Sequence, residues 1–142
     1  MSRVHLQKLA HMRVREAKLL LDGGEWSGAY YLSGYAIEFA LKSCVLHYIE
    51  KTGILFKDKA YLNNLSKFWT HKLDDLLGFA GLKDIRKNDC IANLTLSGYW
   101  GVVNDWNESS RYEEKVEKEA RDLFDAVTSD PDGVLKWTQK YW

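Results

Sequence analysis

Proline occurs once in this chain of 142 residues, at Pro131. The interior of a helix excludes proline more strongly than any other residue, because the ring removes a hydrogen-bond donor and collides with the preceding turn. Long stretches without proline and without clusters of β-branched residues therefore favour helices. No segment shows the alternation of apolar and polar residues that marks a half-buried strand. The sequence predicts an all-α fold.

The first fifty residues predict two long helices joined by a pair of glycines. An apolar stripe with spacings of three or four predicts a helix over residues 2–21; its members are Leu6, Ala10, Val14, Ala17 and Leu21. Gly23 and Gly24 follow, as is typical of helix C-termini. A second helix is predicted over residues 26–50. Because the connection is so short, the two helices should be antiparallel neighbours.

The rest of the chain predicts shorter helices. Residues 51–70 lack a clear period and should form an excursion from the bundle. Thr70 is expected to cap a short helix that Gly81 ends; its apolar residues are Leu73, Leu76, Leu77 and Ala80. A fourth helix over residues 87–104 is predicted to turn inward Ile91, Leu94, Gly98 and Val102. A fifth over residues 112–129 is predicted to bury Val116, Ala120, Leu123, Phe124 and Val127.

Pro131 should end this fifth helix, and a short aromatic helix should follow. The predicted architecture is one domain over residues 1–142, an up-and-down bundle of four to five helices. A chain of this length can bury most of its apolar surface around a single core.

Charge and cysteine content exclude several classes. Twenty basic and twenty acidic residues leave no net charge, whereas strong phosphate binders usually carry a basic excess. Cys44 and Cys90 have no close spacing, so reduced thiols are expected. No apolar run reaches the roughly 18 residues of a membrane span, and the start "MSRVHLQKLAHMRVREAK" lacks the apolar core of a signal peptide. We expect a cytoplasmic protein with no membrane contact.

The segment "AYYLSGYAIEFALKS" in the second helix places an acid and a base in an apolar stretch. Glu38 and Lys42 are one turn apart with the glutamate first, which is the better order for a helical ion pair. Tyr31, Gly34 and Tyr35 precede them and offer a face that a second helix or a subunit can approach. We interpret these five residues as a structural set that specifies how the helix docks. A ligand-binding role for the ion pair is the alternative.

The motif "WNESSRY" is a candidate nucleotide site. Arg111 follows two serines where the fifth helix is predicted to open, and free N–H groups together with a guanidinium can hold a phosphate. Trp106 and Tyr112 could stack on a base. The alternative is structural: a serine caps the helix, and Arg111 pairs with Asp105 or Glu108.

His71 opens the segment "HKLDDLL" and could donate or accept a proton, since an unperturbed imidazole titrates near neutrality. Its alternative role is to cap the helix or to tie the excursion to the bundle. Lys42 and His71 are expected near Arg111, and Lys42 completes the predicted nucleotide-binding set. Cys44 and His47 lie three apart, which is too few ligands for zinc. No metal and no cofactor are predicted.

The order of the motifs resembles the HEPN family, named for nucleotide-binding proteins of higher eukaryotes and prokaryotes. The resemblance rests on "AKLLLDGGEWSGAYYLSGYAIEFALKS", "HKLDDLLGFAGL", "WNESSRY" and "VLKW", and covers about residues 6–138. It implies a four- or five-helix bundle that commonly forms dimers. Members of the family include RNA-cleaving toxins, partners of minimal nucleotidyltransferases, and domains thought to bind nucleotides or nucleic acid.

One motif of the family's nucleases is missing. They carry Arg and His separated by four to six residues on one helix, so that Arg holds the phosphate while His moves protons. None of the six arginines has a histidine at that spacing. Without this motif, the resemblance implies a homodimeric module that binds a nucleotide or nucleic acid, RNA included, as an accessory or toxin-type partner of a separate minimal nucleotidyltransferase. The alternatives are a metal-independent endoribonuclease using His71 with Arg111, and a purely structural subunit.

Overall fold

The computed structural model describes residues 1–142, and all of its regular structure is helical. The α-helices are α1 (Arg3–Asp22), α2 (Trp26–Thr52), α3 (Lys59–Asn64), α4 (Leu73–Phe79), α5 (Lys83–Ala92), α6 (Leu94–Asn104), α7 (Glu117–Thr128) and α8 (Val134–Gln139). Three 3-10 segments lie between them: η1 (Ile54–Phe56), η2 (Leu65–Trp69) and η3 (Glu108–Tyr112). The prediction of an all-α bundle is confirmed. None of the helices combines the length and the apolar character needed to cross a membrane.

The two long helices, α1 and α2, begin and end close to where the sequence predicts. The Ser2 hydroxyl caps α1 by accepting a hydrogen bond from the His5 amide at 3.1 Å. Gly53 ends α2 in the left-handed conformation, with φ of 62°, and its amide donates to the Ile49 carbonyl. Local signals of this kind depend on few residues, which is why the sequence reveals them.

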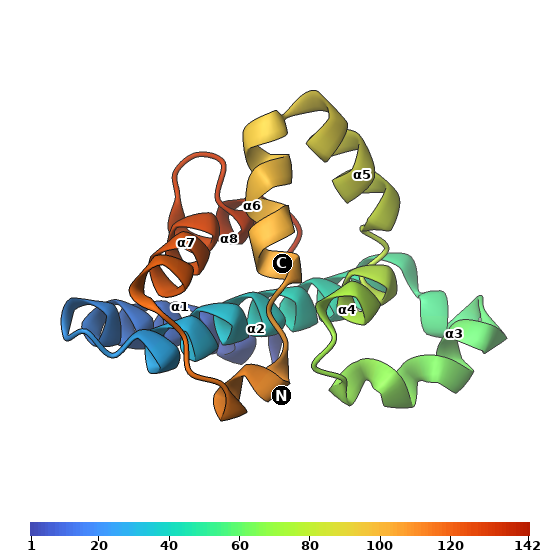
Figure 1. Cartoon of the computed structure of the whole chain (residues 1–142). Helices are drawn as coiled ribbons and strands as arrows, with labels where there is room; N and C mark the ends of the chain where they lie inside the picture. Colours follow the sequence, from blue (N-terminus) through green and yellow to red (C-terminus); the bar gives the residue numbers. More distant parts are fainter.

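Helix α2 is the centre of the molecule. It packs against α1 along its length and against α4, α7, α8 and η3 on its other sides. Its residues are buried on nearly every face, from Ala29 to Val45. Figure 1 shows α6 standing steeply over the α1–α2 pair, while the segment containing α3 extends away from the bundle. Any charged residue in the middle of α2 must therefore be buried.

The predicted excursion over residues 51–70 forms an arm made of η1, α3 and η2. The side chain of Asp58 caps α3 by accepting from the Tyr61 amide at 3.1 Å. The Tyr61 hydroxyl in turn donates to the Phe79 carbonyl of α4 at 2.7 Å. The arm is thus hydrogen-bonded to the body at a point 18 residues further along the chain.

The predicted helix over residues 87–104 is instead two helices, α5 and α6, separated at Asn93. The Asn93 backbone is extended, and its side-chain oxygen caps α6 by accepting from the Leu96 amide. Its amide nitrogen donates to Asp132 at 2.8 Å. Because the helical period restarts after Asn93, the predicted inward face is wrong. Of the residues predicted to face inward, Ile91 and Leu94 are 71% and 82% exposed, Gly98 is exposed and Val102 is half-buried. The residues of α6 that are buried instead are Leu96, Trp100 and Val103.

The helix predicted to begin at residue 112 begins at Glu117, because the preceding stretch is held extended. The Lys115 amide donates to the Ser27 hydroxyl at 2.8 Å, and its ammonium lies 4.6 Å from the centre of the Tyr30 ring. These contacts fix Lys115 against α2, and α7 starts only after it. Val116 is 61% exposed, contrary to prediction, and Phe124 is half-buried, whereas Ala120, Leu123 and Val127 are buried as predicted.

Candidate functional site

The acid and the base of α2 form a buried ion pair. The Lys42 ammonium lies 3.2 Å from Glu38 Oε2, and the two side chains are 6% and 1% exposed. Removing two charges from water is expensive unless their remaining hydrogen-bonding positions are also filled. A second partner for Glu38 is therefore expected.

That partner is His71, which comes from the segment between η2 and α4. His71 Nδ1 lies 2.8 Å from Glu38 Oε1. The predicted role of Thr70 as the cap of α4 is wrong: its hydroxyl accepts from the Lys72 amide at 3.1 Å, and α4 begins at Leu73. This short turn directs His71 toward α2. The imidazole thus ties the end of the arm to the bundle.

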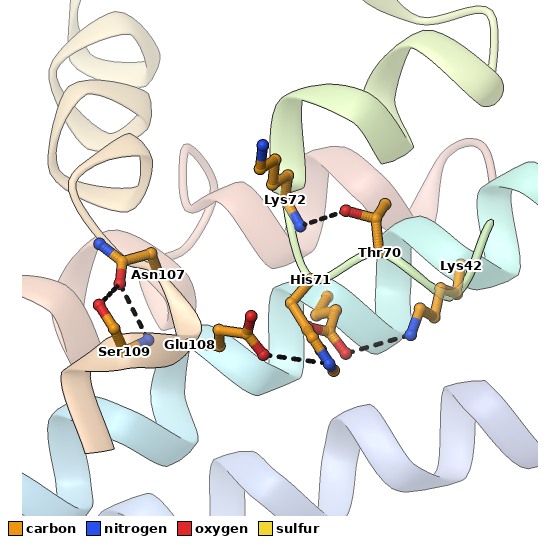
Figure 2. Close-up of polar contacts among 8 residues, drawn as sticks. Lys42, Thr70, His71, Lys72, Asn107, Glu108 and Ser109 are labelled. Atoms are coloured by element: carbon orange, nitrogen blue, oxygen red, sulfur yellow. Dashed lines mark hydrogen bonds and ion pairs between the residues drawn. The ribbon is translucent and has the colours of Figure 1, made fainter. Parts of the chain in front are cut away.

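A second carboxylate completes a chain of four charged or polar groups. Glu108 of η3 lies on the other side of the imidazole, with Oε2 3.1 Å from His71 Nε2. Figure 2 shows His71 reaching α2 with Glu108 on one side and Lys42 on the other. Lys42, Glu38, His71 and Glu108 therefore link three segments that are distant in sequence.

The geometry constrains the protonation of His71. A carboxylate accepts hydrogen bonds, so the bond to Glu38 assigns a proton to Nδ1. Nε2 faces Glu108, whose carboxylate also only accepts, so this contact is favourable only when Nε2 carries a proton as well. In the neutral form Nε2 would face a carboxylate without a donor, and Glu108, whose side chain is 45% exposed, could turn to water. In this arrangement neither ring nitrogen is free for a substrate.

The face of α2 that precedes the ion pair receives Trp106. A Cβ atom at Gly34 would overlap the Trp106 indole, so only glycine permits this approach. Tyr35 packs edge-on against Trp106 at 5.2 Å between ring centres, against Tyr31 at 4.8 Å and against His71 at 6.1 Å. Burial, followed by hydrogen bonding with Tyr31 and the nearby Glu38 charge, raises the pKa of Tyr35. The predicted structural set therefore meets segments of its own chain.

The predicted nucleotide-binding residues are not all accessible. Trp106 is only 3% exposed and packs in the core, so its ring faces are not open to a base. Lys42 is occupied by Glu38 within the bundle. Two members of the set, Arg111 and Tyr112, remain on the surface. Their segment η3 precedes α7 by several residues, so Arg111 does not lie at the start of a long helix as predicted.

Arg111 and Tyr112 form an exposed pair on η3. The guanidinium carbon lies 4.8 Å from the centre of the Tyr112 ring, and Tyr112 is 78% exposed. Polar contact with the Tyr112 hydroxyl, and more weakly with Tyr31, raises the pKa of Arg111. Among the ion pairs of the structure, Glu108 pairs with His71, and neither Asp105 nor Glu108 pairs with Arg111. The cation is therefore not neutralised by a carboxylate.

Sequence reasoning missed the role of Asn107 and the contact of Glu108 with His71. The Asn107 side chain accepts from the Ser109 amide at 2.9 Å and starts η3. An asparagine before Glu-Ser-Ser is a recognisable cap signal. No spacing in the sequence, however, connects Glu108 with a histidine 37 residues earlier.

A scan against models of protein families found no match, and searches of curated proteins and of solved structures found none. The function must therefore be inferred from the side chains of this chain and from its motif order.

Proposed function

We propose that the chain is a module that binds nucleotides or single-stranded RNA, with Arg111 and Tyr112 as its contact surface. One observation carries the proposal: an arginine without a carboxylate partner lies against an exposed tyrosine. A guanidinium binds phosphate oxygens in a bidentate manner, and an aromatic face accepts a base without regard to its sequence. The order of motifs resembling the HEPN family agrees with this class of ligand.

The packing beneath η3 supports the same conclusion. Trp106 anchors the segment that leads into η3, and the contact between Glu108 and His71 holds its first residue. Binding residues are more effective when a rigid scaffold fixes the loop that carries them. Arg111 and Tyr112 are thus presented from a segment that packs against α2 and buries Ser110.

The endoribonuclease alternative has one observation in its favour, the hydrogen bond by which Glu38 orients His71. A carboxylate that orients an imidazole is a common feature of acid–base catalysis. However, Glu108 occupies the outer nitrogen and would repel a phosphate that approached it. We therefore propose that the protein binds its ligand without cutting it efficiently.

The resemblance also leads us to propose a homodimer and a cytoplasmic partner of the nucleotidyltransferase class. Helix α2 offers little surface to a second subunit, because it is buried on nearly every side. The interface is therefore expected on α1, where Val4 and Leu19 are 74% and 72% exposed, or on the late helices.

Fluorescence anisotropy with a labelled mononucleotide and a labelled single-stranded RNA tests the binding proposal. Tyr112→Ala should weaken binding by roughly 5- to 100-fold, the range expected from losing one stacked base. Arg111→Ala should weaken it and should also reduce its dependence on salt, because one phosphate contact is lost. Arg15→Ala is the matched control, since Arg15 is an exposed arginine of α1 that makes no ion pair.

Equal affinity of Arg111→Ala and the unchanged protein would refute the proposed surface. Metal-free cleavage of the RNA that disappears in His71→Ala would establish the ribonuclease instead. Thermal melting should be nearly the same for Arg111→Ala and the unchanged protein, because the Arg111 side chain is exposed.

A further inference from the structure

A polar groove of about 530 Å³ lies between α5 and α6, away from the residues described above. The two helices diverge from the corner at Asn93 (Figure 1). Helix α5 contributes a row of side chains at helical spacing and α6 contributes a second row. The lining residues of α5 are Lys83, Asp84, Arg86, Lys87 and Cys90, and those of α6 are Ser97, Trp100, Gly101 and Asn104.

The groove is positively charged. Three of its lining residues are cations, Lys83, Arg86 and Lys87, and one is an anion, Asp84. Lys83 and Lys87 belong to none of the ion pairs in the structure. Arg86 Nη1 lies 3.1 Å from the Asp74 carboxylate but is not aligned for a hydrogen bond with it. Three cations against one anion give the lining a net charge of +2, which the neighbouring Asp74 carboxylate reduces.

Two of the lining residues carry a buried donor that makes no hydrogen bond. Arg86 Nη1 and the indole Nε1 of Trp100 are both shielded from solvent and make no hydrogen bond within the protein. Trp100 is 2% exposed, and the Arg86 guanidinium lies over its ring at 5.1 Å. Leaving such a donor unpaired is costly, so buried N–H groups nearly always have partners. An acceptor that reached either donor would therefore be stabilising.

The floor of the groove has room for a ligand. No atom lies within 4 Å of the position that a Cβ atom of Gly101 would occupy, so the helix surface next to Trp100 is open. A ligand there would lie beside Arg86 and Trp100, whose Nη1 and Nε1 donors make no hydrogen bond, and beside Lys83 and Lys87, which belong to no ion pair. A phosphate group offers several acceptor oxygens and a negative charge, and it fits this set of donors.

We propose that the groove between α5 and α6 binds the phosphate group of a ligand, using Arg86, Trp100, Lys83 and Lys87. This site is independent of the Arg111 surface and does not depend on the function proposed for it. The phosphate can belong to a free nucleotide or to the backbone of a nucleic acid. The chemistry of recognition is the same for both sources.

Cys90 provides a reporter inside the groove. It is half-buried, and burial raises the pKa of its thiol while the Arg86 charge lowers it. A bound phosphate should slow alkylation by covering Cys90 and by offsetting the charge of Arg86. Cys44 is the internal control: it is 2% exposed, and burial raises its pKa to about 12. Mass spectrometry of the alkylated full chain separates the two thiols.

The alkylation rate should be measured with inorganic phosphate, adenosine monophosphate and a short single-stranded RNA, at constant ionic strength. At least one of these ligands should protect Cys90. Protection by the mononucleotide at lower concentration than by the RNA identifies a free nucleotide as the source, and the reverse order identifies a nucleic acid. In Lys87→Ala, half-protection of Cys90 should need about a tenfold higher ligand concentration, which is the loss of affinity expected for one charge-assisted contact.

Lys8→Ala is the matched control, because Lys8 is an exposed lysine of α1 outside the groove. Trp100→Phe should weaken protection while keeping an aromatic ring over which Arg86 can lie. Protection should persist in Arg111→Ala, which separates this site from the Arg111 surface. Failure of all three ligands to protect Cys90 would refute the proposal, as would equal protection in Lys87→Ala or loss of protection in Arg111→Ala.

Discussion

Replacing Lys42 by methionine should destabilise the protein strongly, although the two side chains are similar in size. The change leaves the Glu38 carboxylate 1% exposed with a single partner, His71. Breaking a buried ion pair from one side typically costs 3–5 kcal/mol. Because the hydrogen bond from His71 remains, we expect a loss at the lower end, about 3 kcal/mol.

Replacing both partners should cost less than replacing one. In the double variant Glu38→Leu with Lys42→Met, no charge is left in the core, and the new side chains can pack one turn apart. His71 loses its bond to Glu38, but its side chain is 39% exposed and can be hydrated. We expect a loss below about 1 kcal/mol, or a small gain, since apolar replacement of buried ion pairs is often neutral or stabilising.

Urea unfolding followed by circular dichroism measures the free energy of unfolding of each variant. The single variants Glu38→Leu and Lys42→Met, together with the double variant, complete a thermodynamic cycle. Lys18→Met is the matched control. Lys18 pairs with Asp22 at the same spacing of four residues, but both side chains are more than half exposed. Lys18→Met should lower the free energy of unfolding by less than about 0.5 kcal/mol.

The outcome refutes the reasoning if Lys42→Met costs no more than Lys18→Met, because the pair would then be accessible to water. It also refutes the reasoning if the double variant loses the sum of the two single losses. That sum would mean that Glu38 and Lys42 act independently in spite of their contact.

Three further predictions concern packing, ionisation and assembly. Gly34→Ala should cost about 1–3 kcal/mol in thermal or urea unfolding, because the new methyl overlaps Trp106, whereas the open Gly98→Ala should be neutral or stabilising. Burial raises the pKa of Cys44 from 9.0 to about 12, so the folded state keeps a proton that the unfolded state loses above pH 9. Stability should therefore fall by about 1.4 kcal/mol per pH unit between these values, and Cys44→Ala should lose this part of the pH dependence. Light scattering at micromolar concentration should give twice the chain mass of 16.5 kDa; a mass of one chain would contradict the dimer.

The sequence predicted the long helices well because their signals are local. The stripe of α1, its glycine stop and the length of α2 depend on residues within a few turns of one another. The break at Asn93 could not be predicted in the same way. Asn93 also bonds to Asp132, which lies 39 residues away, and tertiary contacts of this kind decide where a helix ends.

For the candidate site, too, the sequence predicted the local contacts and not the long-range ones. The spacing of Glu38 and Lys42 indicated an ion pair, and the glycine beside it indicated a close approach. The sequence could not show that the approaching group is Trp106, nor that Glu108 meets His71. Both contacts join segments separated by loops of no regular period, so the predicted base-stacking role of Trp106 was assigned without knowledge of its burial.

We interpret the buried charges of α2 as a feature that favours one orientation of a helix surrounded by apolar partners. Apolar contacts alone tolerate rotation of one element against another, because many arrangements bury similar areas. Glu38 is satisfied only when Lys42 and His71 reach it together. Misplacing the segment that carries His71 would leave a carboxylate unpaired in the core, which is costly. The same imidazole contacts Glu108, so the orientation of α2 also determines where η3 lies and where Arg111 is presented. The ion pair thus connects the core of the bundle with the surface that we propose as the ligand contact.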